Sequence, residues 1–136
     1  MSVKIPEKFN DLIANAIYIW FTTVREDGMP QPTPVWFVRD GETFIIYTTS
    51  AAQKIKNLNA NPKVALGIAH GDAGNFFVVQ GEAVIDHSLP SPTKQAAYFA
   101  KYKDSLPEIG MTPEVFDQQF TLPIRVTPSH VRGMVE

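Results

Sequence analysis

The chain contains no cysteine, no long apolar run and no marked excess of charge of either sign. Its 136 residues include 12 lysines and arginines against 14 aspartates and glutamates. The absence of cysteine excludes disulfide scaffolds, thiolate metal sites, iron–sulfur clusters and thiol nucleophiles. A net charge of −2 argues against a broad basic surface for nucleic acid. No apolar run approaches the roughly 20 residues of a membrane span, and residues 1–10 lack the apolar core of a signal peptide.

These exclusions predict a soluble, cytoplasmic protein that binds neither membranes nor nucleic acid and forms a single domain over residues 1–136. A chain of this length can bury about 70% of the surface that its unfolded form exposes. The prolines stand out, because 11 of them occur in a chain otherwise rich in strand-forming residues.

Segments rich in β-branched and aromatic residues, with turn signals between them, predict six strands. They cover residues 17–25, 31–39, 43–49, 63–70, 75–87 and 122–135, and Pro128 places the last one partly at an edge. Asp40-Gly41 is the strongest hairpin signal, so the first three strands are expected to form a meander. Short helices are predicted over residues 7–16, 50–60, 92–102 and 113–120. This pattern indicates a mainly β fold, a small antiparallel barrel with helices over its open ends.

Pro32 and Pro34 are unusual because they lie inside a predicted strand, two residues apart. Neither can donate a hydrogen bond to a neighbouring strand, which favours an edge position. One interpretation is protection of the edge against aggregation. The other is an edge whose N–H side faces something other than a strand.

Residues 47–66 combine three features that favour an anion. A helix start offers free N–H groups and a partial positive charge. Thr48, Thr49 and Ser50 add hydroxyl donors just before it, and Ser50 with Gln53 fits a capping box. Lys54 adds a point charge about one turn inside the helix. The alternative is a surface helix with an ordinary cap and solvated lysines. The segment is not a Walker loop, since it lacks the glycines and the Gly-Lys-Ser/Thr ending.

Six segments, taken in order, resemble the pyridoxamine-phosphate-oxidase-like family of flavin-binding split barrels. Within that family the resemblance is to the short branch of enzymes dependent on the deazaflavin coenzyme F420. The segments are DGMPQPTPVWF at 27–37, DG at 40–41, YTTSAAQKIKNL at 47–58, NPKVAL at 61–66, VVQGEA at 78–83 and PIRVTPSHVRG at 123–133. The resemblance implies a six-stranded antiparallel split β-barrel that binds FMN or coenzyme F420. It also implies a homodimer with cofactor sites shared between the subunits.

The resemblance also implies which residues contact the cofactor. Those beside the isoalloxazine ring are Thr33, Pro34, Val35 and Trp36, although Trp36 could equally be a core or interface aromatic. Those near the ribityl chain and phosphate are Tyr47, Thr48, Thr49, Ser50 and the phosphate-binding Lys54, with Gln53 and Asn57 as secondary contacts. The candidates that a second subunit would contribute are Phe76, Val78 and Gln80, or Arg125, Arg132 and Met134.

The expected function is hydride transfer between FMN or coenzyme F420 and a small substrate. Two departures limit what the resemblance implies. The longer C-terminal region in which true pyridoxamine phosphate oxidases bind substrate is missing, and Gln53 stands where they tend to have arginine. No evident acid or base is present, so a non-catalytic flavin carrier or sensor is an alternative, and a barrel that binds nucleic acid is a third.

No metal site is predicted, because His70, His87 and His130 lack metal-ligand spacing. Of these, His130 is the one that the last strand could bring near the cofactor.

Overall fold

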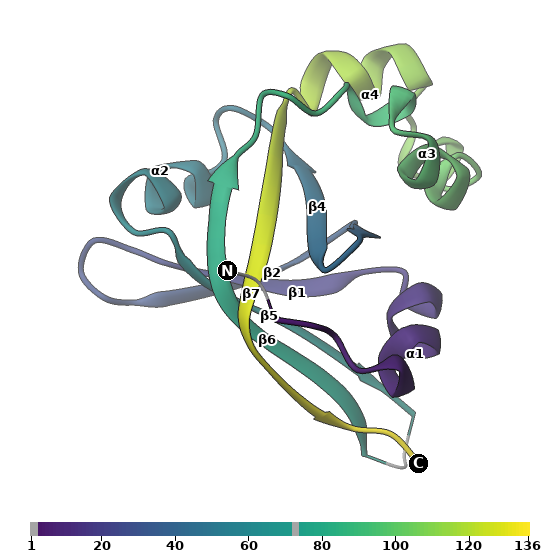
Figure 1. The fold of residues 1–136 in the computed structure, drawn as a ribbon. Helices are drawn as coiled ribbons and strands as arrows, with labels where there is room; N and C mark the ends of the chain where they lie inside the picture. The colour runs from purple at the N-terminus through teal and green to yellow at the C-terminus, as the bar shows by residue number, and fades with distance from the viewer. Residues whose placement is uncertain (1–2, 72–73) are drawn as a thin grey trace.

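A computed structural model describes residues 3–71 and 74–136. Seven strands form one antiparallel sheet in the order β2-β1-β5-β6-β7-β4-β3. They are β1 (Ile19–Val24), β2 (Pro30–Val35), β3 (Val38–Asp40), β4 (Thr43–Thr48), β5 (Lys63–His70), β6 (Asn75–Ile85) and β7 (Leu122–Met134). Because only Trp36 and Phe37 separate β2 from β3 at the opposite end of the order, the sheet must curl strongly (Figure 1). The expected mainly β, antiparallel split barrel is confirmed, with seven strands in place of six.

The single strand predicted over residues 31–39 is two strands, and the predicted meander is wrong. β4 pairs with β3 and β7, not with β2. The break has a physical cause, because Phe37 is fully buried and its backbone is held by a side chain. The Tyr102 hydroxyl accepts a hydrogen bond from Phe37 N at 2.9 Å, where a continuous strand would pair with a neighbour. The Asp40-Gly41 hairpin between β3 and β4 is confirmed, with Gly41 at a φ of 62°.

Residues 3–71 and 74–136 contain four short α-helices and three 3₁₀ turns; one of each precedes β1, and the others lie between strands. The helices are α1 (Asn10–Asn15), α2 (Gln53–Ala60), α3 (Ala96–Tyr102) and α4 (Pro113–Gln119), and the turns are η1 (Glu7–Phe9), η2 (Pro92–Lys94) and η3 (Pro107–Ile109). The capping box predicted from Ser50 and Gln53 does not form, since α2 follows Ala52 and no side chain caps it. The Gln53 amide instead donates to Asn57 Oδ1 at 3.0 Å. In the part of the chain that the structure describes, no helix is long and apolar enough to cross a membrane.

The buried side chains form two hydrophobic clusters. The larger fills the curled sheet and includes Phe21, Phe44 and Phe77, none of which is exposed. The smaller lies between the β3–β4 hairpin and residues 86–121, a segment between β6 and β7 that we call the helical insertion. It joins Ile45 of β4 to Phe116 of α4, among others. Figure 1 shows α3 and α4 together beyond one end of β4, well away from α2. Packing of this insertion on the barrel creates the wall of the site described next.

Candidate functional site

The proline-rich strand β2 is an edge of the sheet, which confirms the sequence prediction. Among the described strands β2 pairs only with β1, where Pro32 lies opposite Thr22 and Pro34 opposite Trp20. Both prolines are exposed. With Pro30 they occupy every second position, and they cannot donate hydrogen bonds. One side of the β2 backbone therefore carries no N–H groups that another strand could use.

A cavity of about 270 Å³ lies at the end of β2. We call it the β2-edge cavity. Six of the eleven residues predicted to contact a cofactor line it: Pro34, Val35, Trp36, Tyr47, Thr48 and Lys54. They come from β2 and the residue after it, from the end of β4 and from the start of α2. These elements are distant in the sheet order, and the curl of the barrel brings them together. The cavity thus lies where the edge strand β2 approaches the end of β4 and the start of α2 without pairing with them.

Lys54 is the cationic group of the β2-edge cavity. Its side chain is partly buried, and burial lowers its pKa. It takes part in none of the four ion pairs found in residues 3–71 and 74–136. Lys54 is also the second residue of α2, whose first turn lacks a side-chain cap. A desolvated lysine beside free helix N–H groups is a suitable environment for an anionic group.

Gln53 and Asn57 do not line this cavity, and they hold α2 against the barrel. Asn57 is only 2% exposed. Its amide nitrogen donates to Thr23 Oγ1 and to Gln31 Oε1, each at 2.8 Å, while its oxygen accepts from Gln53. All polar atoms of the Asn57 side chain are thus bonded within the protein. This network connects the first turn of α2 to β1 and to β2.

The other predicted contacts have different environments. Thr33 lies on β2, and its hydroxyl oxygen is buried without a hydrogen-bond partner in the described residues. Such orphaned groups are uncommon in folded proteins, because desolvating an unpaired hydroxyl costs free energy. Thr49 and Ser50 follow β4 in the turn before α2, where the Thr49 carbonyl accepts from Ala52 N at 3.2 Å. Neither lines the β2-edge cavity.

Sequence reasoning missed the second wall of the cavity, which belongs to the helical insertion. This wall consists of Tyr98, Ile109, Phe116 and Phe120. The spacing of Tyr98 on its helix predicts only packing, and Tyr98 does pack, at 2% exposure. No local signal could show that the insertion folds back over the end of β2. The only sequence hint was the number of aromatic residues in a segment without strand alternation.

Two tyrosines of the cavity are poor proton donors at neutral pH, because burial raises their pKa values. Burial raises the pKa of Tyr47 to about 12, and its hydroxyl donates to Pro90 O at 2.7 Å. Burial also raises the pKa of Tyr98. Both side chains therefore stay protonated, and they serve as packing or hydrogen-bonding groups. Proton transfer to a ligand from either phenol would be strongly uphill.

The residues predicted to come from a second subunit lie elsewhere on the chain. Arg125 is engaged internally, since its guanidinium contacts Asp86 and Asp40, each at 2.9 Å. Phe76 and Met134 are cross-strand neighbours at the opposite end of β6 from Ile85, and Gln80 is opposite His130. None of these lines the β2-edge cavity of the same chain.

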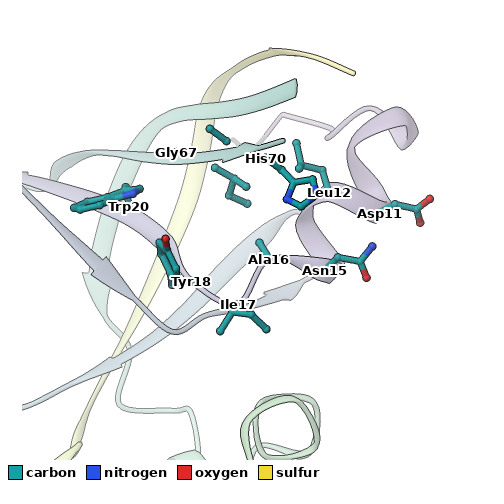
Figure 2. A pocket seen from close by; sticks show the side chains of 11 residues that line it. Asp11, Leu12, Asn15, Ala16, Ile17, Tyr18, Trp20, Gly67 and His70 are labelled. Atoms are coloured by element: carbon teal, nitrogen blue, oxygen red, sulfur yellow. The ribbon is translucent and has the colours of Figure 1, made fainter. Parts of the chain in front are cut away.

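A second cavity of about 380 Å³ lies between α1, β1 and β5. Figure 2 shows Tyr18 and Trp20 on one side of it and His70 with Leu12 on the other. The Tyr18 and Trp20 rings meet edge to face, with centroids 6.5 Å apart, and both are about half exposed. None of the predicted cofactor contacts lines this cavity. Trp20 connects the two regions, because it pairs across the strands with Pro34.

A curled antiparallel sheet that leaves a lined cavity beside its proline edge defines a small split-barrel protein. Residues 5–132 match the family model of pyridoxamine 5'-phosphate oxidase, and the chain belongs to this family. No curated protein sequence matches the chain.

Solved structures agree with this fold. An F420 reductase is 28% identical, with a TM-score of 0.73 over 94% of this chain and 98% of that one. A Clostridium acetobutylicum protein related to general stress protein 26 is 19% identical, with a TM-score of 0.71 over 96% and 90% of the two chains. The haem storage protein HutZ of Vibrio cholerae is 14% identical, with a TM-score of 0.67 over 96% and 95%. The last two similarities concern the fold alone.

Proposed function

We propose that the protein is an oxidoreductase that binds FMN or coenzyme F420 at the β2-edge cavity and transfers hydride to or from a small substrate. The observation that carries this proposal is the composition of the cavity. The aromatic side chains of the cavity, together with a strand edge that has no N–H groups, provide an apolar slot for the rings of the cofactor. Lys54 and the uncapped start of α2 provide a place for its phosphate. Membership of the family and the similarity to an F420 reductase support the same cofactor class.

The residues present fit such a cofactor. Lys54 and the Thr48 hydroxyl would hold its phosphate, and Pro34, Val35 and Trp36 would lie beside its rings. The unpartnered Thr33 hydroxyl is a further group that a polar ligand atom would satisfy. When bound, the cofactor supplies the two-electron hydride chemistry. The chain binds and orients it, and the insertion wall excludes water.

A homodimer belongs to the same proposal. Ile17, Tyr18 and Trp20 are between 47% and 59% exposed and nearly consecutive on β1 and the residues before it. A contiguous apolar surface of this kind is typical of an interaction site. A second copy would cover it, and because Trp20 lies opposite Pro34, that copy would also approach the β2-edge cavity. This arrangement would enlarge a cavity that is small for a complete flavin nucleotide.

The proposal is tested by adding FMN and coenzyme F420 separately to the purified protein while recording visible absorbance and fluorescence. We expect one of them to bind at micromolar concentration, with one cofactor per chain, and light scattering to show a dimer. Absence of binding by both would contradict the proposed function. A monomer that binds one cofactor per chain at micromolar concentration would contradict only the site shared between subunits.

A second candidate is a flavin carrier or sensor without turnover. It is favoured by the protonation behaviour of the cavity, since Tyr47 and Tyr98 are held protonated and no carboxylate lines it. Single-turnover mixing of the reduced, protein-bound cofactor with electron acceptors separates the two candidates. Reoxidation that is faster than for free cofactor indicates an enzyme, and slower reoxidation indicates a carrier.

A further inference from the structure

Four aromatic rings form a stack beside the β2-edge cavity. The Tyr102 and Trp36 rings are nearly parallel, at 5° with centroids 4.5 Å apart. Trp36 and Phe116 follow at 5.7 Å and 25°, and Phe116 and Phe120 at 4.3 Å and 13°. Tyr102 is buried, whereas Trp36 and Phe120 are partly exposed. The stack therefore begins in the core and ends with a ring that a ligand can reach.

Charge is distributed unequally over the two walls of this cavity. The barrel wall carries Lys54 and the Thr48 hydroxyl, whereas Tyr98, Ile109, Phe116 and Phe120 of the insertion wall carry no formal charge. Asp117, the residue after Phe116, does not line the cavity, although its negative charge adds to the effect of burial on the raised pKa of Tyr47 and so offers no partner to an anionic acceptor. Its carboxylate accepts hydrogen bonds from the backbone N and the hydroxyl of Thr93, so it is held within the insertion.

We propose that Phe120 and Phe116 form a platform for the electron acceptor, and that the acceptor is an uncharged, flat aromatic molecule. This inference rests on the proposed function, because it assigns the substrate class of the same cavity. A flat aromatic ring extends the stack at Phe120 in the offset geometry that aromatic pairs prefer. Ile109, 47% exposed and lining the same cavity, adds apolar surface. A charged acceptor would lose hydration against this wall without gaining a partner on it.

The test replaces Phe120 with leucine, which keeps apolar volume and removes the ring face. Naphthoquinone is the flat, uncharged acceptor. It gains a hydride from the reduced cofactor and a proton from water, giving the hydroquinone and oxidised cofactor. Cyclohexenone, which is not aromatic, and a naphthoquinone sulfonate, which is charged, are the comparison acceptors. Phe99→Leu is the matched control, because Phe99 packs on the same hydrophobic cluster but does not line the β2-edge cavity.

We expect Phe120→Leu to raise the KM for naphthoquinone about 2- to 12-fold, with little change in kcat. This factor corresponds to the interaction free energy of one aromatic pair. The KM for cyclohexenone should not change, and Phe120→Tyr should restore the KM for naphthoquinone. The sulfonate should be the poorer acceptor of the two naphthoquinones with the unaltered protein. An equal KM increase for both uncharged acceptors, or the same effect from Phe99→Leu, would overturn the proposal.

A direct binding measurement separates this inference from the cofactor assignment. In a Trp20→Phe background, Trp36 is the only indole, since the chain has two tryptophans. Naphthoquinone should quench Trp36 emission in the cofactor-free protein, and Phe120→Leu should raise its dissociation constant by the same factor. Quenching without any FMN or F420 binding would reject the proposed function and retain the platform. If the cofactor binds but neither the quenching nor the KM changes in Phe120→Leu, the platform is rejected and the proposed function is retained.

Discussion

Replacing Lys54 with methionine should weaken cofactor binding and at the same time stabilise the cofactor-free protein. Methionine keeps most of the unbranched apolar chain and removes the charge. Burial lowers the pKa of Lys54, and no described residue forms an ion pair with it. The folded protein therefore holds fewer protons than the unfolded chain only between this lowered pKa and the ordinary lysine pKa. At lower pH Lys54 is charged in both states, and its desolvated charge costs folding free energy.

The size of the binding effect follows from the contact that Lys54 would make. A charge-assisted hydrogen bond to a phosphate contributes about 1.5–3 kcal/mol. At about 1.4 kcal/mol per factor of ten, the dissociation constant should increase about 10- to 140-fold. Thr48 and the free N–H groups of α2 remain in Lys54→Met, so binding should weaken and not disappear.

Fluorescence titration of FMN or coenzyme F420 measures the dissociation constant, and thermal unfolding without cofactor measures the stability. Lys56→Met is the matched control, since Lys56 is an exposed lysine on the same helix. It should change neither quantity appreciably. Unchanged affinity in Lys54→Met, or an equal loss in Lys56→Met, would refute a phosphate contact. A lower melting temperature in Lys54→Met would refute the desolvation argument.

Three further changes test the fold that positions the site. Tyr102→Phe should lower the free energy of unfolding in urea by about 1–3 kcal/mol, because it removes the hydrogen-bond partner of the buried Phe37 N–H. Gly81→Ala should lower it by about 1–3 kcal/mol, because a Cβ there would overlap the Thr127 carbonyl oxygen. Asp86→Asn should remove a pH dependence of stability. Hydrogen bonds to Ser88 and Arg125 lower the pKa of Asp86 from 3.8 to about 2, so its stabilisation is present above pH 3.8 and lost as the pH falls toward 2.

Each of these changes has its own control. Phe99→Leu, in the same helix as Tyr102, should leave the Phe37 backbone bonds intact, and an equal loss would attribute the Tyr102 effect to general packing. A Cβ at Gly67 would have no atom within 4 Å, so Gly67→Ala is the control. If it lowered the free energy of unfolding as much as Gly81→Ala, the cause would be backbone flexibility and not overlap. If the unaltered protein and Asp86→Asn lose stability equally between pH 3.8 and 2, the Asp86 assignment is wrong.

The sequence predicted the strands well and their pairing poorly. The enrichment of β-branched and aromatic residues between turn signals is a local property, so it located β1, β4, β5, β6 and β7 to within a few residues. It also located the β3–β4 hairpin, because Asp40-Gly41 favours a tight turn. It could not divide residues 31–39, since the division depends on Tyr102, 65 residues further along the chain, binding the Phe37 backbone.

The candidate site shows the same limit. The order of the motifs indicated the family, and the prolines at 32 and 34 indicated an edge, because a missing N–H is a property of one residue. The convergence of Pro34, Thr48 and Lys54 on one cavity was implied only by resemblance. The capping box was wrong because Ser50 lies in the turn before α2, two residues from its cap, and a sequence pattern does not place a helix start that accurately.

By itself, the sequence determined the strand segments, the absence of thiol chemistry, the edge character of β2 and the family. Only the tertiary structure decided that the sheet curls until β2 approaches β4 and α2, and that the helical insertion closes the cavity with aromatic rings. The physical reason is the range of the interactions. Backbone propensity and missing donors act within a few residues, whereas the cavity results from packing and hydrogen bonds between segments that are distant in the chain.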